Sequence, residues 1–236
     1  LSSACGGTAT GRLLPRVVHE DELATVLDAA TACEGRSVAG NLGVLGALGD
    51  AGVPVESDWG LNVTNPWSAA VLAGLGASLV WASPELDSRQ LESLVSSSPV
   101  PIGVIVGGRT ELMVAEHCVL QAAGACSHSC FSCARRRDTW ALLDRKGYRM
   151  PVLTDSAGRA HIYNAVPLDL SRSIAELLES GVDAVRLEME SSSAQEAAAV
   201  TREWRARLDR GAAGGQLPFT SIEEPSTTGH FHRSVR

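Results

Sequence analysis

The sequence predicts an α/β protein with parallel strands, and two observations lead to this fold class. Strand-like and helix-like segments alternate with a period of about 25 to 30 residues, which is typical of βα units. The apolar run VPIGVIVGG at residues 100–108 lies between turn signals, as expected for a strand buried on both faces. About four such units precede residue 116, whereas a closed barrel of eight units needs about 200 residues or more. Two architectures follow: a partial barrel whose first half is missing or supplied elsewhere, or an open doubly wound sheet.

The elements of the first half follow in order. A strand and then a helix beginning at Asp21 are expected within residues 12–32, and a short strand followed by a glycine-rich turn or helix within 37–52. Residues 53–77 read as strand, loop and helix. Val80 to Ala82 would form the next strand, and Ser83 or Asp87 would cap the helix after it.

The second half of the sequence has a different pattern of elements. Residues 138–170 are turn-rich and extended, 171–190 form one more helix and strand, and 193–211 form an amphipathic helix. The sequence therefore predicts a partial barrel, a cysteine-rich loop, a small α+β segment and an irregular tail. Their ranges are 12–115, 116–137, 138–211 and 212–236.

Composition limits the classes of function. Hydrophobic residues make up 44% of the 236 residues, which is enough for a sizeable core. The net charge of -7 does not indicate a nucleic-acid surface. Arg135–Arg137 form a local basic run, which is more often a solvated helix face than a binding patch. No apolar run has the length of a membrane span, and no secretory signal is evident, so we expect a cytoplasmic protein without membrane contact.

The chain begins with Leu, so a fragment or processed product is expected, with a missing N-terminal half or a partner subunit.

Four of the six cysteines lie within EHCVLQAAGACSHSCFSC, residues 116–133. They are separated by seven, three and two residues. Thiolates are soft ligands, and four of them can complete a tetrahedral zinc site or bind a four-iron, four-sulfur (4Fe-4S) cluster. The short spacings and small neighbouring residues would let one loop wrap the metal. We therefore predict a metal or cofactor site at Cys118, Cys126, Cys130 and Cys133, with zinc and the cluster both open.

Polar residues follow several predicted strands. In a barrel, such residues converge on one face and can bind a polar substrate. Arg109 could hold a carboxylate or phosphate there. The candidates for catalysis or substrate binding are Glu56, Asp58, Glu85, Arg109, Glu111, Arg159 and His161.

Signals for proteolysis are weak. The sequence has no G-x-S-x-G nucleophile elbow and no H-E-x-x-H zinc motif. His117 precedes Cys118, but neighbours in sequence point in different directions and do not form a catalytic dyad.

Several ordered blocks resemble the peptidase U32 family, also called collagenase-like peptidases. They are GLNVTNPWSAAVLAGLGASLVWASPELDSRQLESL, GGRTELMVAEHCVLQAAGACSHSC, DRKGYRMPVLTDSAGRAHIYNAVPLDL and TTGHFHRSV. The resemblance covers about residues 36 to 235. It implies a TIM-like barrel, here about its C-terminal half.

The resemblance also implies two kinds of activity. Some relatives carry a 4Fe-4S cluster and act in hydroxylation of nucleic-acid bases or of a quinone precursor, and others carry only the peptidase (hydrolase) label. Cys118, Cys126 and Cys130 match cluster cysteines of such relatives, whereas Cys133 is chosen as fourth ligand by proximity. One type of relative has a cysteine where this chain has Glu111. The expected substrates are thus RNA, a polar small molecule or a peptide, and a metal-stabilised, non-enzymatic partner subunit is the remaining alternative.

Overall fold

The computed structural model describes residues 11–124, 126, 129–212 and 225–233. The chain divides into two compact units. The first unit consists of Leu1–Ile105, Ala175–Arg186 and Gly229–Arg236. The second consists of Val106–Ile174 and Leu187–Thr228.

The first unit contains a parallel sheet. Its strands are β1 (Arg12–Leu13), β2 (Ser37–Ala39), β3 (Val55–Ser57), β4 (Ala77–Trp81) and β5 (Ile102–Gly108). They pair side by side in chain order, and all four pairings are parallel, as the βα rhythm predicted. A later strand, β11 (Ala184–Glu188), pairs with β5. The first six residues of β5 are buried, which confirms the expected fully buried strand.

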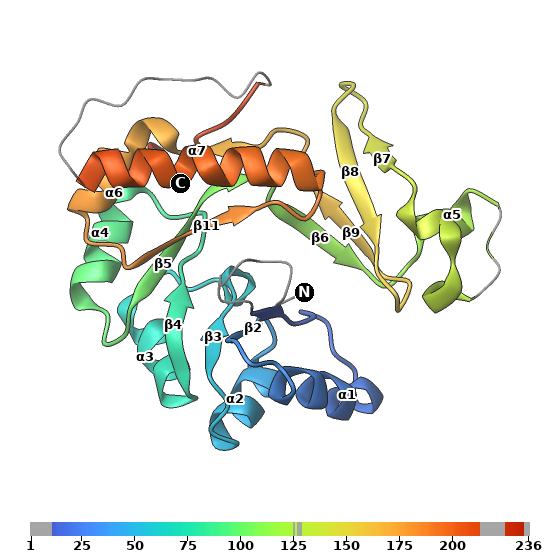
Figure 1. Cartoon of the computed structure of the whole chain (residues 1–236), viewed down its shortest axis with the longest axis horizontal. Coiled ribbons are helices and arrows are strands. Elements are labelled where there is room, and N and C mark those ends of the chain that lie inside the picture. Colours follow the sequence, from blue (N-terminus) through green and yellow to red (C-terminus); the bar gives the residue numbers. More distant parts are fainter. Residues whose placement is uncertain (1–10, 125, 127–128, 213–224, 234–236) are drawn as a thin grey trace. The chain divides into compact units, whose positions relative to one another are not determined.

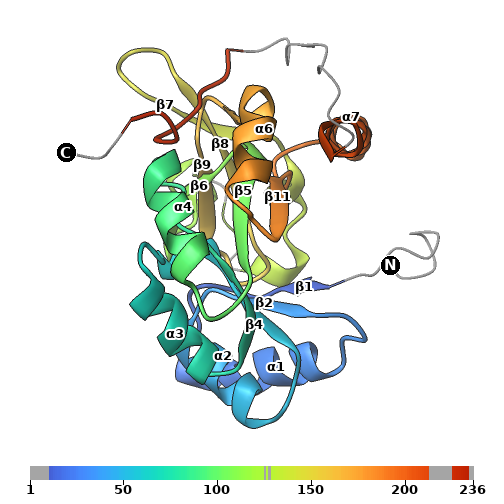
Figure 2. The ribbon, with the colours of Figure 1, turned by 90° about the vertical axis from the view of Figure 1, so that its left-hand side faces the viewer.

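Four helices connect these strands: α1 (Glu20–Thr31), α2 (Leu42–Asp50), α3 (Pro66–Gly74) and α4 (Ser88–Ser97). They lie along the outer side of a curled sheet (Figures 1 and 2), which is consistent with a partial barrel. Side-chain caps fix their starts. Asp87, one of the two expected caps, accepts a hydrogen bond from the Gln90 backbone N–H at 2.9 Å.

Packing of aliphatic side chains holds the first unit together. Fully buried residues come from the strands and from the inner faces of the helices, and each contributes roughly 1.5–3 kcal/mol on burial. They include Leu45, Leu48, Val55, Val80, Leu94, Ile102 and Ile105. The short helix α6 (Ile174–Glu179) is followed by Gly181, whose φ of 79° is typical of a glycine that terminates a helix.

The second unit contains an antiparallel sheet in the order β6-β9-β8-β7. The strands are β6 (Glu111–Ala115), β7 (Trp140–Leu143), β8 (Arg149–Thr154) and β9 (Ala160–Tyr163). The remaining elements are α5 (Val119–Ala122), β10 (Leu168–Asp169), which pairs with the end of β5, and α7 (Ala194–Ala212). The stretch expected to be extended and turn-rich is therefore a pair of hairpins. Gly147 and Gly158 form the tight turns with positive φ.

The two faces of this sheet differ. Val152, Ala160 and Ile162 pack on one face, with Val119 and Trp140 against them. Leu153 and His161 are paired across β8 and β9, and alternation along the strands places them on the opposite face. The sheet itself thus separates the side chains on one face from those on the other.

The tail expected at 212–236 is partly outside the described residues, since these resume at 225. Thr227 forms a β-bridge with Leu168 in the second unit. Phe231 is buried in the first unit, and its carbonyl oxygen accepts the Ser88 N–H at 2.9 Å. Within the described ranges, no helix combines the length and apolarity needed to cross a membrane.

Candidate metal centre

The four clustered cysteines line one pocket of the second unit. Cys118 immediately precedes α5, Cys126 follows that helix, and Cys130 and Cys133 bracket a single turn of 3-10 helix. All four are half-buried. The pocket is small, with a cavity volume of about 10 Å³. Its other lining residues are Leu120, Ser129, Arg136 and Thr154.

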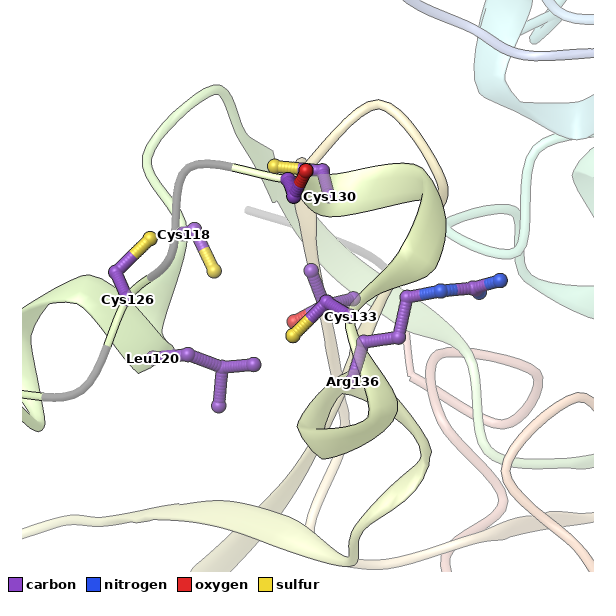
Figure 3. A pocket seen from close by; sticks show the side chains of 8 residues that line it. Cys118, Leu120, Cys126, Cys130, Cys133 and Arg136 are labelled. Atoms are coloured by element: carbon purple, nitrogen blue, oxygen red, sulfur yellow. The ribbon is translucent and has the colours of Figure 1, made fainter.

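The sulfur atoms are directed into this space. Figure 3 shows Cys118 and Cys126 on one side of the pocket and Cys130 and Cys133 on the other, with the sulfurs of each pair turned towards the opposite pair. The structure thus brings together all four of the predicted ligands. The neighbouring His117 is exposed, and His128 lies outside the described residues.

The described side chains are not arranged around a single ion. No three His, Cys, Asp or Glu side chains in the described ranges could share a metal ion. A zinc ion with Zn–S bonds of about 2.3 Å requires four sulfurs within about 4 Å of one another. A four-iron cluster gives each thiolate its own iron atom, so its ligands stand further apart. Four thiols lining one pocket are a donor set that suits either occupant, a zinc ion or a four-iron cluster.

The pocket wall carries polar atoms with unused hydrogen-bonding capacity. Thr154 is 8% exposed, and its hydroxyl is buried without a hydrogen-bond partner among the described residues. The same is true of Arg136 Nε, although Figure 3 shows that guanidinium extending away from the sulfurs. A buried hydroxyl is costly when it has no partner. A thiolate or cluster sulfur would supply the acceptor that Thr154 lacks.

The β8–β9 turn supports one wall of the pocket. Gly158 has φ of 90°, and a β-carbon built there would lie 2.7 Å from the Cys130 sulfur. Only glycine combines this backbone conformation with such a close approach. The position of Cys130 therefore depends on a residue 28 positions further along the chain.

An ionic cluster occupies the opposite face of the sheet. The Nδ1 of His161 contacts a carboxylate oxygen of Glu111, and its Nε2 lies 3.5 Å from Asp155 Oδ2. The hydrogen bonds with Asp155 and Glu111 outweigh the opposing effect of burial and raise the pKa of His161 to about 9. For Asp155, burial raises the pKa, but hydrogen bonds from His161 and from backbone N–H groups hold it below its ordinary value. The imidazole is thus a cation between two carboxylates at neutral pH.

Other sequence candidates also have partners within the protein. Arg159 forms an ion pair with Glu116 at 3.0 Å, and Arg109 donates to the carbonyl oxygens of Asn164, at 3.0 Å, and Ala165. Glu85 is an exposed loop residue of the first unit. Among the predicted substrate-binding residues, the side chains of Glu111 and His161 contact each other directly.

The first unit has its own buried ion pairs. Asp58 is completely buried and accepts from Arg16 Nε at 2.6 Å and Arg186 Nη1 at 2.8 Å. Glu56 accepts from Trp81 Nε1 at 3.0 Å and pairs with Arg36 at 3.1 Å. These pairings are those of a structural network, and none of them was predicted from the sequence.

Sequence reasoning missed four residues around these sites: Thr154, Asp155, Gly158 and Arg186. The run TDSAGR at 154–159 did carry a signal, because Asp followed by Gly three positions later is a common turn pattern. Nothing local linked that turn to the cysteines. Arg186 had no local signal at all.

Comparison with known proteins agrees with the resemblance noted in the sequence. Two proteins named "tRNA hydroxylation protein P", from Helicobacter pylori strains J99 and 26695, are each 25% identical to this chain over 167 residues. The match covers 66% of this chain but only 39% of each relative, so the chain spans well under half of their length. A solved structure of a U32 peptidase aligns with 44% of this chain and 60% of its own, at 17% identity and a TM-score of 0.29.

The family itself is defined by a match that covers almost the whole chain. Residues 18–235 match the family described as "Peptidase family U32". That range includes the cysteine loop, the antiparallel sheet, the parallel sheet except β1, and the described part of the tail. This chain belongs to peptidase family U32.

Proposed function

We propose that this chain forms the cluster-binding part of a U32 protein that hydroxylates tRNA, and that Cys118, Cys126, Cys130 and Cys133 hold a 4Fe-4S cluster. The observation that carries the proposal is that four thiols from one short loop line a single pocket. The name of the two relatives supports tRNA as the substrate. When bound, the cluster would supply one-electron transfer.

The chain's own residues would prepare this pocket. Leu120 is 3% exposed and limits access of water to the sulfurs, which protects a cluster from hydrolysis and oxidation. Thr154 would donate a hydrogen bond to a sulfur atom. Hydrogen bonds of this kind stabilise negative charge on sulfur and tune the reduction potential.

Zinc is the alternative occupant. Four thiolates are a common structural zinc set, and zinc binding would then serve folding rather than catalysis. The lack of a three-ligand group among the described side chains speaks against it. Measuring the iron and zinc content of the protein distinguishes the two occupants directly.

Proteolysis is the activity that the family label suggests, but the described residues give it little support. A serine or cysteine peptidase needs a histidine nitrogen that accepts a proton from the nucleophile. Both nitrogens of His161 face carboxylates, and the four thiols lie on the other side of the sheet. His161 and Glu111 therefore act as a structural pair in this proposal, and no reacting role is assigned to Glu85, Arg109 or Arg159.

The test is anaerobic purification of the chain followed by measurement of iron, acid-labile sulfide and zinc. We expect a brown protein with about four iron atoms and four sulfides per chain. Cys126→Ser should lose the iron and lower thermal stability. Cys33→Ser is the matched control, because Cys33 is also half-buried but lies outside the cysteine loop.

Activity is tested separately. The full-length gene product, with and without Cys126→Ser, would be expressed in cells that lack it, and hydroxylated nucleosides in tRNA would be measured by mass spectrometry. Full iron content in Cys126→Ser would refute the proposed ligand set. One tightly held zinc and no iron would favour the zinc alternative, and peptide cleavage that survives removal of all four cysteines would favour a peptidase.

A further inference from the structure

A basic segment follows the cysteine loop in an otherwise acidic chain. Residues 135–149 contain six basic and two acidic residues, whereas the whole chain has a net charge of -7. The segment comprises a turn of 3-10 helix (Ala134–Arg137) and the β7–β8 hairpin. Such a local reversal of charge indicates a surface for an anionic partner.

Three basic side chains of this segment are available for a ligand. Arg145 and Lys146 are exposed in the hairpin turn, and Arg149 is exposed at the start of β8. None of the three forms an ion pair with any residue in the described ranges. By contrast, Arg16, Arg159 and Arg186 are each paired with a carboxylate elsewhere in the chain; their partners are Asp58, Glu116 and Asp58.

The nearest carboxylate does not neutralise them. Asp144 Oδ1 accepts the backbone N–H groups of Lys146, at 2.8 Å, and Tyr148, at 2.9 Å. This carboxylate therefore shapes the turn that presents the basic residues. It leaves their charged groups directed to solvent.

Aromatic side chains accompany the positive charge. Tyr148 is 52% exposed beside Arg149, and the Arg135 guanidinium lies 5.3 Å from the centre of the Trp140 ring. Proteins that bind single-stranded nucleic acids combine basic side chains with aromatic rings on which bases stack. This hairpin likewise combines basic side chains with aromatic rings.

The basic segment begins beside the cysteine pocket. Arg136, in the turn that precedes β7, lines that pocket. From Trp140 to Leu143 the strand extends over about 10 Å at roughly 3.4 Å per residue. A polyanion bound at the hairpin turn would therefore have to extend along β7 to reach the pocket.

We propose that Arg145, Lys146, Arg149 and Tyr148 form a docking surface for tRNA, with the cations on phosphates of an unpaired loop and Tyr148 stacked on one of its bases. The choice of RNA as partner rests on the proposed function. A tRNA held there would extend along β7 towards the pocket, and charge would provide most of the binding.

The test measures binding of fluorescently labelled tRNA by anisotropy over a range of salt concentrations. The variant Arg145→Gln/Lys146→Gln/Arg149→Gln should bind at least about tenfold more weakly, and the slope of log affinity against log salt should become shallower by about 2 to 3. Tyr148→Ala should weaken binding about fivefold or more with an unchanged salt slope.

The matched control removes the same number of charges from another exposed element. Arg202, Arg205 and Arg210 are exposed on α7, so Arg202→Gln/Arg205→Gln/Arg210→Gln changes the net charge equally. We expect less than about a twofold change in affinity for this control. Circular dichroism confirms that each variant is folded.

Three results would overturn the docking surface: no tRNA binding by the unmodified chain, equal losses in both triple variants, or binding to vesicles of anionic phospholipid in preference to tRNA. Binding is measured without turnover, so it does not depend on the cluster. A chain that binds tRNA through the hairpin but never holds iron would refute the proposed function alone. A chain that holds the cluster and modifies tRNA, with binding unaffected by the hairpin substitutions, would refute the docking surface alone.

Discussion

Gly158 lies directly against the sulfur of Cys130, and a β-carbon at position 158 would stand only 2.7 Å from it. The turn between β8 and β9 thereby fixes one of the four thiols from outside the cysteine loop. The relationship connects the antiparallel sheet to the metal centre, and it makes the pocket sensitive to a single added methyl group.

Gly158→Ala should therefore impair the metal centre specifically. The methyl group must displace Cys130, so we expect loss of most bound iron, and faster reaction of the apoprotein's thiols with a colorimetric reagent. Gly147→Ala is the matched control, because Gly147 has a similar φ of 86° with no atom within 4 Å of the added carbon. Both variants should lose about 1–2 kcal/mol from backbone strain, but Gly147→Ala should keep its iron. Equal iron contents in the two variants would contradict the role of this contact.

Thr154 should tune the cluster rather than hold it. Thr154→Val keeps the shape of the side chain and removes the hydroxyl, so the cluster should still assemble, with a more negative reduction potential because a hydrogen bond to sulfur is lost. Thr154→Ser should restore the original potential. The measurement is a redox titration followed by electron paramagnetic resonance. An unchanged potential in Thr154→Val would show that the hydroxyl does not face the cluster.

The Glu111–His161–Asp155 cluster should make stability depend on pH in the alkaline range. The pKa of His161 is raised from 6.5 to about 9 in the folded chain, so its contribution is complete below pH 6.5 and is lost as the pH rises through about 9. After allowance for solvent screening the contribution is about 1–2 kcal/mol. Urea unfolding at pH 6 and pH 9.5 should show this loss in the unmodified chain and a smaller one in His161→Gln. The same pH dependence in both proteins would exclude His161 as its source.

The buried carboxylate of Asp58 should be essential for the first unit. Asp58→Asn removes a charge that balances both Arg16 and Arg186, and breaking a buried pair typically costs about 3–5 kcal/mol. Asp209→Asn is the control, since its pair with Arg205 is exposed and should contribute less than about 1 kcal/mol. Thermal denaturation of both variants tests the difference. Similar melting temperatures for the two variants would argue against the buried network.

The strands and helices of the first half were predictable because their signals are local. Asp87 caps a helix through an N–H three residues away, and the buried strand β5 is an uninterrupted apolar run. The four cysteines were equally visible, since they lie within a single short loop. The hairpins of the second half were predicted only as extended chain, because their pairing depends on turns whose geometry the periodic pattern does not reveal.

By itself, the sequence determined that this chain has parallel βα units, a cluster of thiols and the motifs of its family. Only the tertiary structure decided which residues from distant parts of the chain contact one another. Asp58 and Arg186 are 128 positions apart, and Thr154 and Gly158 reach the thiols from the β8–β9 hairpin. Helix caps and buried strands depend on neighbours within a few residues, whereas these contacts depend on strand register, and a shift of one residue would turn each side chain to the other face of its sheet.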